Sequence, residues 1–422
     1  MEFTWHLGPL AVLLFLGSAS SSLAQQLPSA NQDDLQMNEP LQSRYDRRGL
    51  LERFYIGPFQ VAAVTQADLG FNDNVFAQPS GQKSDFFVDL GGKLITTYRY
   101  DAFSAELDAY LLDHQYLSLT SEDYWEGNGR LSLREAPAPD FAYFLQSGIQ
   151  RLAVPRTDPN PIDGRTPATY LLFDTLAGVT IGSGQRNLLT LSVGYDQTQF
   201  DSVEGLTGPI DTAERNRTEV FGDFRWDHVF FGQQKFFVEL RPDTRNYAQD
   251  VDTAGFRQSS NGARLDTGMV FEPDGLFLIT ASTGYQQQDY ADPRFGTIGE
   301  PDAVLDVQWS PTLLTQIDAK YVHEYAEDID IDSPGYTRNE AIVTLSHELR
   351  RDILVTLLVS DDYRDLERSP RRFDVIDVGP RVQYRLADGV QLGFTYDHQQ
   401  LNSNSTIRYG DDTALVTVKK TF

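Results

Sequence analysis

The chain has 422 residues, of which 12% are aromatic and none is cysteine, and its formal net charge is −26. The lack of cysteine excludes a disulfide framework and a cysteine-ligated metal site. The acidic balance opposes binding to nucleic-acid phosphates and does not fit a basic protein that docks on a membrane surface.

The first 24 residues are expected to form a signal peptide. An apolar run from Leu7 to Leu16 is followed by small residues and by the tripeptide at 22–24, which fits a signal peptidase site. The start contains Glu2 and no lysine or arginine, which departs from the usual basic start. A short buried helix is the alternative, but glycine and proline interrupt the run. We therefore expect cleavage after Ala24.

Residues 25–57 are polar and have no clear periodicity, so we interpret them as a periplasmic N-terminal segment. Beyond them, no segment offers the roughly 18 consecutive apolar residues that a membrane-spanning helix needs. If the mature chain crosses a membrane, it must do so as a closed barrel, because lipid cannot satisfy the backbone polar groups of an open sheet. Residues 58–422 are therefore the candidate barrel.

From residue 59 to the end, apolar and polar residues alternate in segments of about 10 to 15 residues, as in strands with one apolar and one polar face. In one such segment Phe103, Leu107 and Leu111 alternate with Glu106 and Asp108. We expect the charged members of the polar faces to line a lumen, and these are Glu106, Asp108, Asp223, Arg225, Asp227, Glu239, Arg241, Asp243, Arg245, Asp318, Lys320, Asp377, Arg381 and Arg385.

Short turns and longer polar connections alternate between the predicted strands. This sorting of loops is typical of outer-membrane barrels, whose short turns face the periplasm and whose long loops face outward. The predicted strands span 59–72, 84–99, 102–117, 121–136, 140–154, 168–182, 186–200, 215–231, 234–248, 260–273, 275–290, 300–310, 312–326, 336–350, 353–365, 371–386, 389–402 and 412–422. The prediction is an all-β, transmembrane, antiparallel up-and-down barrel of about 18 strands with both termini periplasmic, and 16 strands are the alternative.

Aromatic residues gather near the predicted strand ends, for example Tyr98, Tyr100 and Phe103. They suit an interfacial girdle, although ordinary strand propensity also enriches such residues. The chain ends in Phe422, preceded at two-residue steps by apolar residues except at Lys420. This ending resembles the signal by which barrel-assembly machinery recognises its clients. Outer-membrane lipid and lipopolysaccharide are the other expected partners.

Residues 44–87 carry a family resemblance. The matching features are Tyr45-Asp46 followed by Gly49, Gly57-Pro58-Phe59, Asn72-Asp73-Asn74-Val75-Phe76 and Ser84-Asp85. This stretch resembles the putative β-barrel porin type 2 family, which includes the EpsL-like barrels of exopolysaccharide operons. The resemblance implies an outer-membrane barrel linked either to export of a surface polysaccharide, with export components as partners, or to general permeation.

The motif at 72–76 also has a physical interpretation. Asn72, Asp73 and Asn74 are turn formers whose side chains can bond the backbone, and Val75 and Phe76 could hold the loop on the rim. We favour structural closure of the loop over ligand binding.

No catalytic residue, cofactor or metal site is predicted. The sequence has no Gly-x-Ser-x-Gly elbow, no His-Glu-x-x-His and no P-loop, and its six histidines lack metal-ligand spacing. The nearest cation motif is the acidic run 327–332, but Ser333 and Asn339 stand where a calcium loop needs glycine and glutamate. A solvated acidic loop is favoured over a divalent-cation bridge to lipopolysaccharide phosphates.

Three functions follow in order of support. The first is a porin-like passive channel, which could also conduct an exported polysaccharide. The second is a structural accessory barrel whose lumen is closed by the N-terminal segment or an inward loop, and the third is an outer-membrane enzyme. The lumen charges either select solutes or form ion pairs that only stiffen the wall.

Overall fold

The computed structural model describes residues 40–49, 54–162, 164–182, 186–205, 208–232, 234–273, 275–327, 333–386, 389–404 and 407–422. The predicted signal peptide, residues 25–39 and most of the acidic run at 327–332 lie outside these ranges. Within the described part of the chain, no helix is long and apolar enough to cross a bilayer.

Strands dominate the described residues. They are β1 (Phe54–Ile56), β2 (Phe59–Asn72), β3 (Asp85–Tyr100), β4 (Phe103–Tyr116), β5 (Tyr124–Ala138), β6 (Phe141–Ala153), β7 (Thr169–Ile181), β8 (Asn187–Phe200), β9 (Val203–Glu204), β10 (Pro209–Ile210), β11 (Arg217–Phe231), β12 (Gln234–Tyr247), β13 (Ser260–Phe271), β14 (Phe277–Tyr290), β15 (Thr297–Thr312), β16 (Thr315–Ala326), β17 (Tyr336–Arg350), β18 (Ile353–Leu366), β19 (Arg372–Arg385), β20 (Val390–Ser403) and β21 (Tyr409–Thr421). One α-helix, α2 (Leu41–Gly49), and two 3-10 turns, η3 (Thr120–Glu122) and η4 (Ala213–Arg215), complete the described elements.

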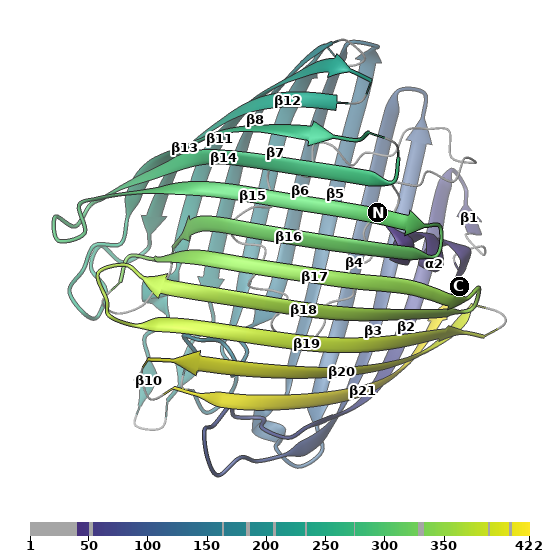
Figure 1. Ribbon diagram of the computed structural model, residues 1–422. Helices are drawn as coiled ribbons and strands as arrows, with labels where there is room; N and C mark the ends of the chain where they lie inside the picture. Colours follow the sequence, from purple (N-terminus) through teal and green to yellow (C-terminus); the bar gives the residue numbers. More distant parts are fainter. Residues whose placement is uncertain are drawn as a thin grey trace.

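The long strands form one closed antiparallel sheet (Figure 1). Each strand pairs with the next in chain order, and β2 closes the sheet on β21 from Val64 opposite Thr421 to Asn72 opposite Thr413. The sheet has 19 strands, and leaving out the three-residue β1 gives eighteen wall strands among the described residues. The prediction of an 18-stranded up-and-down barrel is confirmed.

The two rims differ in their connections. Two to five residues join most strand pairs at one rim, whereas the other rim carries connections such as 73–84, 154–168, 201–216 and 248–259. Figure 1 shows α2 and the C-terminus at the same end of the barrel. That end is the short-turn rim, because β2 leaves it and β21 returns to it.

Side-chain alternation separates the two faces of the wall. On β11, Val220, Phe224 and Trp226 are exposed, whereas the intervening Asp223 and Arg225 are buried. Leu111 on β4 is likewise 55% exposed, because its side chain lies on the same outer face of the sheet. Apolar side chains thus point to the outside, where lipid is their solvent, and charged ones point into the barrel.

Five prolines lie within the described wall strands, each where one ladder is interrupted, and three of them illustrate this. Pro301 pairs with Tyr285 of β14, but pairing of β15 with β16 begins only at Ala303. Pro242 and Pro380 likewise lie in gaps of the β11–β12 and β19–β20 ladders. A missing N–H is tolerated there, since no partner needs it. β15 begins at Thr297, three residues before the predicted start, because residues 297–300 already pair with β14.

A candidate pore and its constriction

The structure places all fourteen predicted lumen residues on the inner face, opposite exposed apolar neighbours. They do not form one group. Glu106 and Asp108 lie on β4, and Asp377, Arg381 and Arg385 lie on β19. Six of the set line one inner cavity of about 300 Å³: Arg225, Glu239, Arg241, Asp243, Arg245 and Lys320.

One long connection, residues 154–168 with residue 163 outside the described ranges, enters the barrel and crosses it. It leaves β6, and the Thr157 carbonyl oxygen accepts a hydrogen bond from the Tyr409 hydroxyl of β21. Ile162 packs on Ala168 and Val203. The cavity is lined by Val154, Asp158 and Asn160 of this connection on one side and by the wall strands on the other. We call residues 154–168 the constriction loop.

Arg156 holds the constriction loop in shape. Its guanidinium Nε and Nη2 donate to both carboxylate oxygens of Glu122, at 2.8 and 3.1 Å. It also donates to the carbonyl oxygens of Ile162 and Gly164, at 3.1 and 2.9 Å. Glu122 is only 2% exposed, so this forked ion pair is shielded from water, and loss of either partner would leave an uncompensated buried charge.

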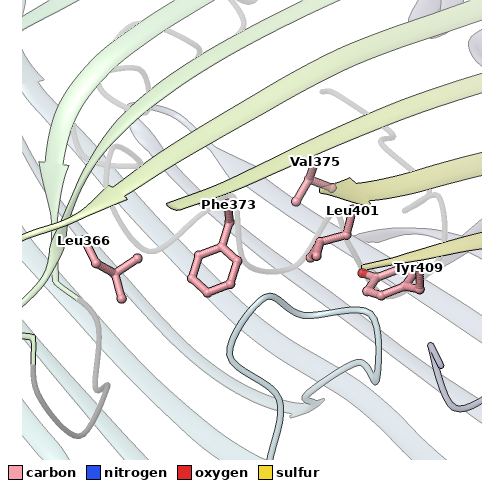
Figure 2. Close-up of a cluster of buried hydrophobic side chains, with 5 residues drawn as sticks. All are labelled: Leu366, Phe373, Val375, Leu401 and Tyr409. Atoms are coloured by element: carbon pink, nitrogen blue, oxygen red, sulfur yellow. The ribbon is translucent and has the colours of Figure 1, made fainter. Parts of the chain in front are cut away.

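The wall under the far side of the constriction loop is apolar. Figure 2 shows Leu366, Phe373, Val375, Leu401 and Tyr409 along the ends of neighbouring strands β18 to β21. Ala77 of the first long connection and Tyr336 pack on this cluster. The cluster is almost fully buried, so the space on this side is filled, and the cavity lies toward β11–β18.

The wall that faces the cavity is crossed by ion pairs. On β11 and β12, Arg225 pairs with Asp227 at 3.0 Å and with Glu239 at 2.8 Å. Arg241 pairs with Glu219 at 3.3 Å, and Arg245 lies 3.5 Å from the same carboxylate. Each of these acids thus contacts one or two arginines. We call this network of paired acids and arginines on the inner wall the ion-pair lattice, and it fixes the positions of the long arginine side chains.

The lattice continues over β13 to β18. Arg264 pairs with Asp266 and Asp302, each at 2.7 Å. Arg338 pairs with Asp362 at 2.9 Å. The carboxylate of Glu324 lies between these two arginines, 3.9 Å from Arg264 and 3.8 Å from Arg338. These charges are paired with one another, as expected if they stiffen the wall. They also line the passage, as expected if they select solutes.

At the opposite, short-turn rim, α2 lies against the inner wall. The Tyr45 ring is fully buried, lies 4.0 Å from the Arg385 guanidinium, and its hydroxyl donates to the Asp352 carbonyl oxygen at 2.9 Å. Burial raises the pKa of Tyr45 to about 12, so the phenol stays protonated and can donate. Leu41 packs on Leu354. The structure thus adds a docked helix to the segment expected to be a polar lead-in.

The motif at 72–76 ties the first wall strand to the last. The Asn74 side chain donates to the carbonyl oxygens of Gln78 and Gly410, at 3.0 and 2.8 Å, and its oxygen accepts from the Gln78 amide at 2.9 Å. The Asp73 carboxylate accepts from the Asp412 amide at 2.8 Å. These side-chain to backbone bonds close the loop at the rim where β2 meets β21.

Sequence reasoning missed the constriction loop, α2 and half of the ion-pair lattice. The missed lattice residues, such as Arg264-x-Asp266 and Asp362-x-Arg364, have the two-residue spacing that identified the others and could have been found by it. Within the described residues, no group of three or more metal-binding side chains is arranged to hold a cation.

A family model described as "Putative beta-barrel porin 2" matches residues 52–422. No curated protein matches the sequence significantly.

Solved structures with a similar arrangement include Pseudomonas aeruginosa OpdK with vanillate, at 11% identity, a TM-score of 0.47 and coverage of 86% of this chain and 99% of that one. Acinetobacter baumannii OccAB4 has 11% identity, a TM-score of 0.47 and coverage of 88% and 99%. Pseudomonas aeruginosa OccK2 in complex with glucuronate has 11% identity, a TM-score of 0.46 and coverage of 86% and 98%. Because these TM-scores are below 0.5, the family match carries the comparison.

Proposed function

Because this chain belongs to the putative beta-barrel porin 2 family and is a porin-like barrel of the bacterial outer membrane, we propose that it passes small hydrophilic solutes between the constriction loop and the wall formed by β11–β18. The observation that carries the proposal is the charged cavity between these two surfaces. A water-accessible space lined by polar side chains inside a closed barrel is what a restrictive porin requires.

Charge balance at the constriction suggests selection mainly by size. The cations that line the cavity are Arg215, Arg217, Arg225, Arg241, Arg245, Arg264, Lys320, Arg338 and Arg364, and the acids are Asp158, Glu219, Glu239, Asp243, Asp266, Asp306, Glu324 and Glu327. The two sets are nearly equal, and most members are paired. The lattice therefore stiffens the passage without giving it a strong single sign.

Planar bilayers provide the test. Purified, folded protein should give stepwise conductance in potassium chloride, with a reversal potential near zero in a salt gradient and exclusion of larger polyethylene glycols. A folded barrel that conducts nothing across a range of salts and sugars would refute the channel proposal.

Export of a surface exopolysaccharide is the narrower form of this proposal. The resemblance to EpsL-like barrels motivates it, and partners among polysaccharide export components follow from it. The constriction loop would have to leave the lumen to admit a chain. Polysaccharide that stays in the periplasm of a deletion strain, and returns to the surface on complementation, would support it.

A second candidate is a barrel that its own N-terminal segment keeps closed, and the docked α2 favours it. Deleting residues 25–49 separates the two: conductance that rises on deletion indicates a plug, whereas unchanged conductance indicates an open pore.

For an open and for a plugged barrel alike, we propose that the short-turn rim with both termini faces the periplasm, that lipid and lipopolysaccharide surround the apolar belt, and that barrel-assembly machinery recognises Phe422.

A further inference from the structure

Two long connections meet at one corner of the cavity. The connection between β8 and β11, residues 201–216 with 206–207 outside the described ranges, packs on the constriction loop, where the Arg165 amide donates to the Glu204 carbonyl oxygen at 2.8 Å. Its 3-10 turn η4 lies against β8, because the Asn216 side-chain oxygen accepts a bond from the Phe200 amide at 2.7 Å. These contacts fix Arg215, the last residue of η4, beside Phe200 at the edge of the cavity.

The neighbouring wall offers an aromatic surface. Tyr170 of β7 lies directly opposite Phe200 of β8 in the ladder, and the two rings stack with their centroids 4.9 Å apart. Phe200 also packs on the buried cluster of Ile162, Ala168 and Val203, which fixes the position of its ring. Both aromatic side chains line the cavity together with the guanidinium at the end of η4. We call Tyr170, Phe200 and Arg215 the aromatic corner.

The Arg215 guanidinium is unused within the described part of the chain. Among the nine cations that line the cavity, Arg215 and Lys320 are the two whose side chains make no ion pair or hydrogen bond with a described residue. Asp158, an acid of the constriction loop that lines the same cavity, is 6% exposed and accepts a bond from the Asn160 amide at 2.7 Å. A guanidinium presents its N–H donors in a plane that matches a carboxylate. The aromatic corner therefore combines a free anion-binding group with a flat apolar surface.

We propose that the aromatic corner binds solutes that carry a carboxylate on an aromatic ring, with the carboxylate on Arg215 and the ring against the stacked Tyr170 and Phe200. Stacked rings favour a further π-system over an aliphatic chain. A cavity of about 300 Å³ is at the lower limit of small-molecule sites, so the solute has a single ring. The inference rests on the proposed channel function, because the solute reaches the corner through the passage, and it adds retention of one chemical class to selection by size.

Equilibrium binding of three small probes tests the proposal. With the full mature chain folded in detergent, saturation-transfer NMR should detect binding of benzoate. Acetate has the carboxylate without the ring, and benzamide has the ring without the charge. In competition with benzoate, each should bind about ten-fold more weakly or worse, because each uses only one part of the corner.

Two cations of the cavity give a matched pair of variants, since each lacks an ion pair and removal of its charge breaks no described contact. Arg215→Gln should weaken benzoate binding by about ten-fold, as expected for the loss of charge-assisted hydrogen bonds, and Lys320→Gln should leave it unchanged. Phe200→Leu should weaken it several-fold, whereas Phe200→Tyr keeps the ring and should bind as the parent does. If gel mobility shows that Phe200→Leu does not fold, the matched pair and the three probes still decide the question.

Equal effects of Arg215→Gln and Lys320→Gln, equal binding of benzoate and either other probe, or no binding of benzoate would each overturn the inference. The NMR readout does not need conductance. A barrel that conducts but does not bind benzoate therefore rejects the aromatic corner alone, whereas benzoate binding by a barrel that never conducts rejects the channel proposal alone.

Discussion

Removing the Arg156 side chain should release the constriction loop. Arg156→Ala leaves the Glu122 carboxylate, 2% exposed, without its counter-charge, and leaves two carbonyl oxygens of the loop without donors. Breaking a buried pair in this way costs about 3–5 kcal/mol. Since about 1.4 kcal/mol is a factor of ten, the docked loop should lose on the order of 10²-fold to several 10³-fold in population relative to released states.

The readout is single-channel conductance together with exclusion of graded polyethylene glycols. Arg156→Ala should conduct more, with added open-state noise, and should admit larger polymers than the unmodified protein. The double variant Glu122→Gln/Arg156→Met removes both charges and should lie between the two, because no uncompensated charge remains. If Arg156→Ala shows the same conductance and the same polymer cut-off as the parent, the loop does not set the width of the passage.

Three further predictions concern pH, α2 and the seam of the barrel. Burial raises the pKa of Asp158 in the constriction loop, so the docked loop favours the protonated carboxyl group. Protonation of Asp158 therefore stabilises the docked loop fully below the usual aspartate pKa of about 3.9, and this stabilisation is lost as the pH rises through the raised pKa. Conductance should therefore fall on acidification more in the parent than in Asp158→Asn, and equal pH profiles would contradict this. If α2 plugs the barrel, Tyr45→Ala should raise conductance by undocking it, whereas Tyr45→Phe, which keeps the ring over Arg385 but loses the hydroxyl bonds, should have a smaller effect in the same bilayer recording; in an open pore neither variant should change conductance. Asn74→Ala removes three part-buried hydrogen bonds of a buried side chain and should lower barrel stability by about 1–3 kcal/mol in thermal unfolding followed by gel mobility, while Asn261→Ala, whose bond to Thr244 is exposed, should have little effect.

The strands of the barrel wall could be predicted because the sequence patterns that produce them are local. Alternation of apolar and polar residues and the spacing of short turns gave strand ranges that agree within about three residues, for example 336–350 for β17. Several of the three-residue differences occur at strand ends near long connections, such as β21, which begins at Tyr409. There the part of a strand that extends beyond the lipid has a polar sequence, which cannot be distinguished from the sequence of the adjoining loop.

The contents of the lumen were not predictable because they depend on distant contacts. The constriction loop is fixed by Tyr409, about 250 residues away along the chain, and α2 is fixed by residues of β16 to β19. Polar composition predicts an exposed connection for both segments. The only local signals were Leu41 and Tyr45 on one helical face and the apolar Ile162 within a polar loop.

The pairing of β2 with β21 makes the two ends of the polypeptide depend on each other. Until its last dozen residues have been synthesised and delivered, the growing sheet keeps two open edges, each with a full row of unsatisfied N–H and C=O groups. A product truncated by an early stop codon or by a protease near its C-terminus can never reach a sealed state. Loss of β21 would therefore leave these backbone groups unpaired in a medium that cannot solvate them, which makes lipid insertion of an incomplete copy unfavourable.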